Sequence, residues 1–392
     1  MTESLITPPL IRPAVIGASG YAVRPTHVQV QLARLSDNLN IIRAHVGPNT
    51  AVMAVLKANA YGHGLVPVAR HLEDAGLDAI GVAYLEEGVL LRQAGVQCPI
   101  LVLGGLVDDQ IAAFIEHDLA LTASSPTKLA AIERIAAQLG IRARVHLKFD
   151  TGMGRIGVRW SNAGPLLQRA ASCTHVEIEG IFSHFANADI TDLAHARVQL
   201  QRFQSVLSAA RKVGLKPRWR HIANSGGLRL LPESHLDMVR PGISLFGVTP
   251  SPHVPLLSGL RPALRWVSRV VYFKAIEAGM PVSYGSTWTP RSRTRLVTVP
   301  VGYGDGYFRS LSNRAEVILR GRRYPVVGRV CMDQMLVNIG GDSAWNGDTV
   351  TLLGEAEGHA ISTEAMATRA GTIPYEVLTN INTRVPRVYR TS

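Results

Sequence analysis

The sequence predicts an α/β protein in which a (β/α)8 barrel of the TIM type is followed by a mainly β C-terminal domain. First, short apolar runs alternate with amphipathic stretches between about residues 50 and 248, which is the pattern of successive strand–helix units. Second, Pro250, Pro252, Pro255 and Pro262 form a stiff segment after this region. Third, the residues beyond it consist of short β-rich runs separated by turn signals.

Eight candidate strands can be counted in the first region. They recur at intervals of roughly 25 residues, which fits a closed barrel better than an open sheet, although a doubly wound sheet gives the same alternation. The candidates are Val52–Leu56, Ala79–Ala83, Ile100–Leu103, Leu119–Thr122, Val145–Phe149, Ile178–Ser183, Arg220–Ala223 and Met238–Leu245. The clearest helix runs from Leu193 to Ala210, with apolar residues three and four apart.

These patterns predict four parts of the chain. Residues 1–22 are expected to be a disordered leader, since prolines interrupt them and they contain no continuous apolar core of the kind that a secretion signal needs. Residues 23–250 form the barrel domain, whose first strand, about 26–32, could pair with the C-terminal domain. Residues 251–262 are the proline-rich boundary. Residues 263–392 form the β-rich domain, beginning with a long candidate strand, Leu264–Lys274.

Composition excludes several classes of protein. No apolar run reaches the roughly 18 residues of a membrane span. Cys98, Cys173 and Cys331 are few and far apart, which argues against a disulfide framework or a zinc site and favours the cytoplasm; we expect no metal. The formal net charge is +12, but the basic residues are scattered and lack stacking aromatics, so nucleic-acid binding is not expected.

Polar side chains follow several of the candidate barrel strands. Lys57 ends the first strand, and a barrel places its active site at the carboxyl ends of its strands. A lysine there can form a Schiff base with a carbonyl cofactor, or it can simply solvate a strand end. Other strand ends carry Lys148, His184, Asn224, Ser225 and Arg240. Such convergence is typical of an active site.

Long motifs give a resemblance to a known family. They include AVLKANAYGHG from residue 54, HLKFDTGMGRIGV from 146, HIANSGG from 221, VRPGI from 239, VGYGDGYFR from 301 and VGRVCMDQ from 327. With FSHFANAD, VSYG, IPYEVL and RVPRVY, they make the chain from about residue 24 to 389 similar to the alanine racemases. Gly304 departs from the pattern, because the family more often has Ala there.

The resemblance implies an amino-acid racemase that exchanges the Cα hydrogen of alanine, with pyridoxal 5'-phosphate as its cofactor. Two bases are needed, one on each face of the substrate. Lys57, which also holds the cofactor, would serve the D form and Tyr284 the L form. An ordinary tyrosine has a pKa of about 10, too high for an efficient base near neutrality. Cations must therefore act on Tyr284, and Arg155 is the first candidate.

The resemblance also implies the cofactor contacts. Arg240 would face the pyridine nitrogen, with His221 behind it, and His184 would flank the ring. Because arginine keeps its protons, that nitrogen would remain an acceptor. The other cofactor-binding positions, most of them for the phosphate, are Tyr61, Asn224, Ser225, Gly242, Ile243 and Tyr375.

Substrate and access residues follow from the same resemblance. Arg155 and the main chain of Met332 would hold the substrate carboxylate. Lys148 would be either a plain lysine or a carbamylated one that pairs with Arg155. Tyr303 and Asp333 would support the site, with Tyr303, Tyr284 and Tyr375 as an inner gate. The outer gate would consist of Asp189, Arg309, Arg329 and Ile373.

Partners and role are also implied. The family completes each site with the β domain of the other subunit, which predicts a homodimer with shared sites, and its product D-alanine serves peptidoglycan synthesis. A racemase of serine or of broader specificity is the main alternative, since one methylene or hydroxyl discriminates weakly. A decarboxylase would show a catalytic cysteine, and a non-enzymatic carrier of the cofactor would lack the β domain.

Overall fold

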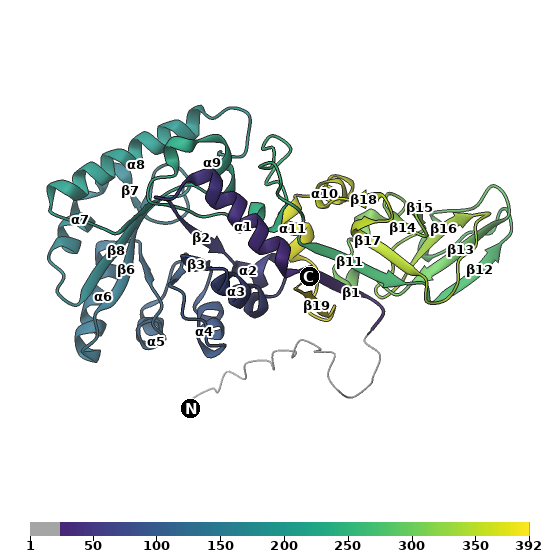
Figure 1. Cartoon of the computed structure of the whole chain (residues 1–392), viewed down its shortest axis with the longest axis horizontal. Helices are drawn as coiled ribbons and strands as arrows, with labels where there is room; N and C mark the ends of the chain where they lie inside the picture. Colours follow the sequence, from purple (N-terminus) through teal and green to yellow (C-terminus); the bar gives the residue numbers. More distant parts are fainter. Residues whose placement is uncertain (1–23, 392) are drawn as a thin grey trace. The chain divides into compact units, whose positions relative to one another are not determined.

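The structure, a computed structural model, describes residues 24–391, so the expected leader lies outside the described residues. The chain divides into two compact units (Figure 1). One, the barrel unit, consists of residues 34–261. The other, the β unit, combines the described residues up to Ala33 with the chain from Pro262 onward.

Within the described chain, eight parallel strands form the barrel. They pair as β10-β2-β3-β4 and β5-β6-β8-β9. A parallel bridge between Leu101 and Ala120 links these two groups on one side. On the other side, backbone hydrogen bonds run from Asp237 to Arg220 (3.2 Å) and from Arg240 to Ala223 (2.9 Å). The strands are β2 (Ala51–Val55), β3 (Ala79–Val82), β4 (Ile100–Val102), β5 (Leu121–Ala123), β6 (Ala143–Asp150), β8 (Val176–Phe182), β9 (Trp219–His221) and β10 (Met238–Val239).

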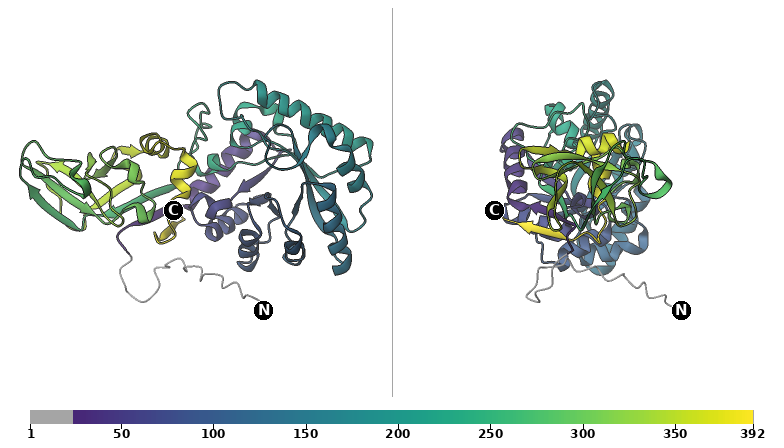
Figure 2. Two further views of the ribbon diagram at one scale, coloured as in Figure 1. Left: turned by 180° about the vertical axis from the view of Figure 1, so that it is seen from behind. Right: turned by 90° about the vertical axis from the view of Figure 1, so that its right-hand side faces the viewer.

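Helices follow the strands and lie outside them (Figures 1 and 2). The expected helix from Leu193 is present as α8 (Ala194–Lys212). The others are α1 (Leu32–Val46), α2 (Lys57–Tyr61), α3 (Leu65–Asp74), α4 (Leu85–Gln93), α5 (Ile111–Glu116), α6 (Pro126–Leu139), α7 (Gly164–Ala171) and α9 (Ser225–Leu230). Strand β3 is fully buried, as expected when a parallel sheet is covered on both faces. No described helix is both long and apolar enough to cross a membrane.

The eighth barrel strand is much shorter than the sequence predicted. The apolar run Met238–Leu245 suggested one strand, but β10 ends at Val239 and residues Ile243–Phe246 form a 3-10 turn. Pro241 has no N–H to donate to a ladder, and Gly242 turns the chain with ψ −99°. The result brings the backbone of Gly242 and Ile243 to the carboxyl end of the barrel.

The β unit is built on one large, mostly antiparallel sheet of ten strands within the described residues. Its order is β12-β13-β16-β15-β14-β17-β11-β1-β19, with β18 paired to β17. Strand β1 (His27–Gln31) pairs with β11 and β19. The others are β11 (Leu264–Arg269), β12 (Tyr272–Ile276), β13 (Thr294–Val299), β14 (Glu316–Leu319), β15 (Arg322–Val327), β16 (Met335–Gly340), β17 (Thr349–Ala356), β18 (His359–Ile361) and β19 (Arg387–Arg390), with helices α10 (Thr363–Ala370) and α11 (Pro374–Thr379).

The single strand predicted over Leu264–Lys274 is two strands. Val270 donates its N–H to Asp348 (2.9 Å), and Val271 donates to Thr298 (3.0 Å). The chain therefore changes partner from β17 to β13 within two residues. A continuous apolar run does not reveal such a break.

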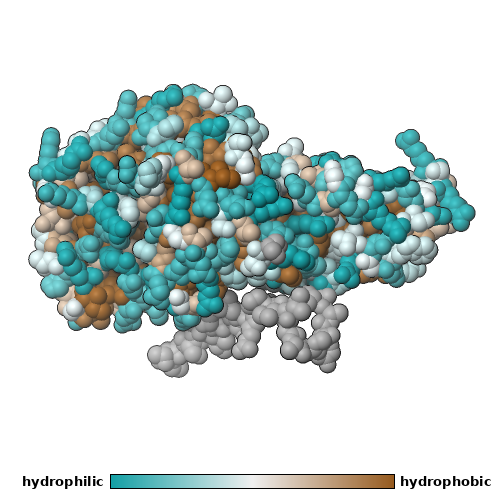
Figure 3. All heavy atoms as spheres, in the orientation of Figure 1, coloured by the Kyte–Doolittle hydropathy of each residue, from teal (hydrophilic) through white to brown (hydrophobic). Residues whose placement is uncertain are grey.

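In the view of Figure 3, the face toward the viewer is mostly hydrophilic, and its hydrophobic residues form separate patches.

Candidate active site

The segment after β2 carries Lys57 on a strained turn. Residues 58–61 all have positive φ, between 50° and 56°, although none is glycine. This left-handed conformation costs roughly 1–2 kcal/mol per residue. Glu87 on α4 holds the turn, since its carboxylate accepts the N–H groups of Ala58 (2.7 Å) and Ala83 (2.8 Å). Strain maintained in this way is typical of functional sites.

The surroundings of Lys57 favour its neutral amine. Burial and then the Arg155 guanidinium lower the pKa of Lys57, while Glu87 offsets part of this effect. A larger fraction of neutral amine is therefore available near neutral pH, and only that form acts as nucleophile or base.

A cradle of backbone donors lies beside Tyr61. A Cβ atom on Gly242 would come within 2.4 Å of Tyr61 Oη, so a side chain at this position would collide with the tyrosine. Ser225 Oγ accepts the N–H groups of Gly242 (3.1 Å) and Ser244 (3.4 Å). Asn224 caps α9 through the N–H of Gly227 (2.9 Å). Buried Ile243 begins the 3-10 turn, so the donors here come from a short turn rather than from a long helix.

Arg240 is buried at the centre of the barrel end. Its Nη2 donates to the carbonyls of Ser183 (2.8 Å) and Ile222 (3.1 Å) and lies 3.3 Å from His184 Nδ1. Its Nη1 lies 2.8 Å from His221 Nδ1. Burial lowers the pKa of Arg240 to about 9, which leaves it charged at neutral pH. Burial and this guanidinium hold the pKa of His184 well below its usual value, so His184 is neutral.

Lys148 on β6 is an isolated buried amine. Its Nζ lies 4.2 Å from the centre of the Phe182 ring, and no hydrogen-bond acceptor for it is found between residues 24 and 391. Burial, followed by Arg240 and Arg155, holds the pKa of Lys148 well below its usual value. A buried ammonium without an acceptor is costly, so the neutral amine is favoured.

Arg155 lies on a loop that β6 and α8 fix in place. The carboxylate of Asp150 accepts the N–H groups of residues 152–154. Arg202 donates to the carbonyl of Thr151 (3.0 Å). Arg155 is exposed, and together with Lys148 and His184 it lines a small pocket at the carboxyl end of the barrel. Asp189 follows β8, where its carbonyl accepts the hydroxyl of Ser251.

The remaining predicted site residues lie in the β unit, on neighbouring loops. Ser283, next to Tyr284, donates to the carbonyl of Arg329 (2.6 Å). Tyr303 donates its N–H to Cys331 (3.0 Å), the residue before Met332. Hydrogen bonds thus join the loops that carry Tyr284, Tyr303, Arg329, Met332 and Asp333. Arg309 lies in a 3-10 turn, and Ile373 and Tyr375 lie at the start of α11.

Two models of known protein domains match most of this chain. Residues 30–250 match the N-terminal domain of alanine racemase, and residues 263–389 match its C-terminal domain. The chain belongs to the alanine racemase family. The alanine racemase of Symbiobacterium thermophilum is 45% identical over 368 residues, which cover 94% of this chain and 97% of that protein. The alanine racemase of Geobacter sulfurreducens is 41% identical over 371 residues, which cover 93% and 97%.

Solved structures support the same family. The alanine racemase of Streptomyces lavendulae, a producer of D-cycloserine, has a TM-score of 0.91 and 38% identity, covering 94% of this chain and 98% of that one. A histidine racemase from Leuconostoc mesenteroides has a TM-score of 0.87 and 28% identity, covering 94% and 99%. The fold is thus shared by racemases that are named for different amino acids.

The departure at Gly304 has a structural counterpart in this member of the alanine racemase family. A Cβ atom on Gly304 would lie 2.6 Å from Nη2 of Arg384. That guanidinium donates to Asp305 and to Asp333 (2.7 Å each) and to the carbonyl of Met332 (3.4 Å). Glycine at 304 therefore leaves room for an arginine that holds the Met332 loop.

Two buried residues of the barrel were missed by the sequence reasoning. His146 and Glu179 are connected to His221 behind Arg240. His146 lies two residues before Lys148 in the segment HLKFD, so the period of a strand places both on one face. That spacing was the available signal for His146, whereas nothing in the sequence distinguished Glu179 from an exposed strand residue.

Proposed function

We propose that this chain is a pyridoxal-phosphate-dependent racemase that interconverts L-alanine and D-alanine with two bases. The observation that carries the proposal is the convergence of Lys57, Arg240 and the Gly242–Ser225 cradle at one end of the barrel. The family to which the chain belongs supports the same activity.

The barrel residues fit the cofactor by their chemistry. Lys57 supplies an amine whose pKa is lowered, which suits a covalent link to a carbonyl carbon. Ser225, Tyr61 and the N–H groups of Gly242 and Ile243 supply donors for a phosphate, and the missing side chain of Gly242 allows close approach. His184 and Asn224 complete the set within the barrel unit, and Tyr375 is a further residue expected to bind the phosphate.

Arg240 would face the ring nitrogen as a donor only. Its guanidinium stays charged at neutral pH, so it does not accept a proton, and the nitrogen beside it stays unprotonated. When bound, the cofactor withdraws electrons from the substrate Cα and makes its hydrogen acidic. With an unprotonated ring this withdrawal is moderate, which favours simple proton exchange over side reactions.

The two bases are assigned to the two faces of the substrate. Lys57, once released from the cofactor, would take or return the hydrogen of D-alanine, and its lowered pKa supports that role. Tyr284 would do so for L-alanine. Arg155 and the main chain of Met332 would hold the carboxylate, Arg155 through two parallel N–H donors.

Lys148 would carry a carbamate. A neutral amine adds to the carbon of carbon dioxide and loses one proton to water, which gives a carbamate. Burial, Arg240 and Arg155 hold the pKa of Lys148 low and so favour the neutral amine. The carbamate is an anion, so it would relieve the crowding of positive charge and could pair with Arg155.

A homodimer is part of the proposal. Tyr284, Tyr303, Met332 and Ile373 are large, apolar or aromatic side chains that the isolated chain leaves exposed. Three of them, Tyr284, Tyr303 and Met332, lie on loops joined by hydrogen bonds, and a contiguous exposed apolar patch marks an interaction site. We place the barrel of the second subunit against them, with Tyr284, Tyr303 and Tyr375 as the inner gate, Asp189, Arg309, Arg329 and Ile373 as the outer gate, and Asp333 as a support. The three free cysteines support a cytoplasmic enzyme that supplies D-alanine for peptidoglycan.

The test is an assay of D-product from a panel of L-amino acids with the purified full chain and added cofactor. L-Alanine is expected to be the best substrate, with serine well behind and histidine inactive. Serine or histidine as the best substrate would replace the proposed specificity with that of another racemase. No racemisation of any amino acid by folded, cofactor-loaded protein would reject the proposal.

A further inference from the structure

Four polar side chains form a continuous buried chain beneath the site. It runs from Arg240 Nη1 to His221 Nδ1 (2.8 Å), from His221 Nε2 to His146 Nδ1 (2.9 Å) and from His146 Nε2 to Glu179 Oε2 (3.3 Å). Their exposed fractions are 3%, 0%, 2% and 8%. We call these residues the Arg240–Glu179 chain.

The two end residues determine which ring nitrogen carries the hydrogen in each of the two histidines. Arginine only donates, so His221 Nδ1 must accept and His221 Nε2 must carry hydrogen. His146 Nδ1 then accepts, and His146 Nε2 donates to the carboxylate of Glu179. If either imidazole took up a second proton, two N–H donors would face each other at one of these contacts. Accordingly, burial and then Arg240 hold the pKa of His221 well below its usual value, and burial lowers that of His146 despite Glu179.

The barrel strand between the two histidines leaves space for this hydrogen-bonded series of side chains. His146 lies on β6 and His221 on β9, and β8 runs between them. Gly180 is the β8 residue opposite His146, and a Cβ atom there would lie 2.2 Å from His146 Nδ1. Only glycine therefore leaves room for the ring. Phe182, two residues further along β8, stacks on the ring of His221, with the ring centroids 4.9 Å apart and an interplanar angle of 6°.

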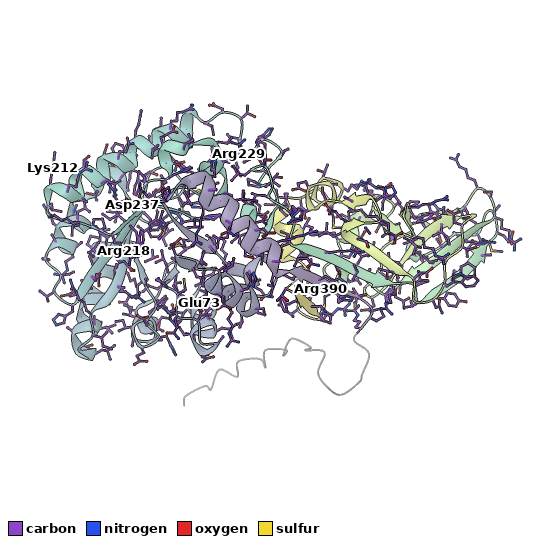
Figure 4. All side chains as sticks on the ribbon, in the orientation of Figure 1. Glu73, Lys212, Arg218, Arg229, Asp237 and Arg390 are labelled. Carbon is purple, nitrogen blue, oxygen red and sulfur yellow. The ribbon has the colours of Figure 1, made fainter. Side chains whose placement is uncertain are left out.

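The two ends of the chain differ in charge and position. Arg240 lies at the carboxyl end of the strands, whereas Glu179 lies toward the opposite end and lines a cavity there with Arg142, Lys216 and Arg218. Figure 4 labels Arg218 on the barrel unit. The carboxylate thus balances the guanidinium through two neutral imidazoles.

We propose that His146 and Glu179 are positioning residues that lock the tautomer of His221 and hold Arg240 as a donor toward the cofactor ring. This inference rests on the proposed function, because the ring nitrogen is its endpoint. With both histidines in one tautomer, His221 accepts a hydrogen bond from Arg240 and supports it in one orientation. The other tautomer, in which His221 would turn an N–H group toward Arg240, is excluded.

Glu179→Gln tests directly whether the carboxylate of Glu179 holds the two histidines in one tautomer. An amide can donate as well as accept, so this end of the chain no longer excludes the other tautomer of His146 and His221. In that tautomer His221 turns an N–H group toward Arg240, and the hydrogen bond between them is lost. The readout is nitrogen NMR of the full chain with labelled histidine, recorded without added cofactor. The parent protein is expected to show both rings with hydrogen on Nε2, and Glu179→Gln a mixture of tautomers. Glu177→Gln is the matched control, since Glu177 lies exposed on the same strand, and Glu179→Asp should retain the single tautomer.

A second readout uses the cofactor-loaded enzyme. The ratio of transamination to racemisation is expected to rise in Glu179→Gln and to stay unchanged in Glu177→Gln. If Glu179→Gln does not fold, His146→Gln takes its place, since its amide also removes the fixed direction. Unchanged tautomers together with an unchanged ratio would overturn the inference. Because the NMR measurement needs no cofactor, it separates failure of this inference from failure of the racemase assignment.

Discussion

In the barrel unit most of the expected site residues are buried and held by surrounding hydrogen bonds, whereas in the β unit most of them lie exposed on loops and turns. Arg240 is 3% exposed and Tyr284 is 71% exposed. Behind Arg240 lies a chain of buried partners, while next to Tyr284 it is Ser283 that donates a hydrogen bond, to the carbonyl of Arg329. We therefore propose that a single chain prepares the cofactor half of the site and presents the other half for a second subunit.

The largest expected effect comes from the barrel side. Lys57→Ala removes both the cofactor link and one base, so racemisation should fall by at least about a thousandfold in both directions. The assay is D-alanine formation and its reverse, with circular dichroism to verify folding. Lys212→Ala is the matched control, because Lys212 is exposed at the end of α8 (Figure 4). Borohydride reduction that fixes cofactor to any lysine other than Lys57 would contradict the assignment.

The β side should give a one-sided effect. Tyr284→Phe removes only the proposed base for L-alanine, so Cα exchange from L-alanine in deuterated water should slow by about 10²–10⁴-fold. Exchange from D-alanine should fall far less. Tyr272→Phe serves as a control, since Tyr272 is also exposed in the β unit. Equal losses for both enantiomers would show that Tyr284 is not specific for one face.

The cradle can be tested by adding one methyl group. Gly242→Ala places a carbon 2.4 Å from Tyr61 Oη, and such overpacking costs about 1–3 kcal/mol. We expect cofactor affinity to weaken by about 5- to 150-fold, measured by fluorescence titration. Gly164→Ala is the control, because no atom lies within 4 Å of its added Cβ. Equal affinities in the two variants would remove Gly242 from the cofactor site.

How much of this was predictable depends on the kind of signal. The barrel strands were predicted to within a few residues because buried parallel strands leave clear apolar runs. The same signal extended the predicted eighth strand too far, across Pro241 and Gly242. Glu177 and Glu179 lie two residues apart in β8, so a regular strand would place both on the same face. Yet Glu177 is exposed and Glu179 is buried. Which of them meets His146 depends on the irregular register between β6 and β8. Such contacts between distant strands leave no local pattern.

The smallest expected effect concerns stability against pH. Burial and Arg240 hold the pKa of His184 well below 6.5 in the folded chain, while the unfolded chain takes up a proton near 6.5. The stabilising contribution is therefore present above pH 6.5 and is lost as the pH falls below it, by about 1.4 kcal/mol per pH unit for one proton. His184→Gln should reduce the slope of unfolding free energy between pH 6.5 and 5 by that amount. An unchanged slope in His184→Gln would refute the assignment of a neutral His184.

The contrast between the units is tested most directly by mixing two inactive variants. Lys57→Ala chains are co-expressed with Tyr284→Phe chains under separate affinity tags, and the mixed dimers are isolated and assayed for racemisation of L-alanine. If each site combines the barrel of one chain with the β unit of the other, one of the two sites in a mixed dimer contains both intact bases. Activity should then return to about half that of the parent dimer. If verified mixed dimers remain as inactive as either variant alone, each chain builds its own site and the shared-site account is wrong.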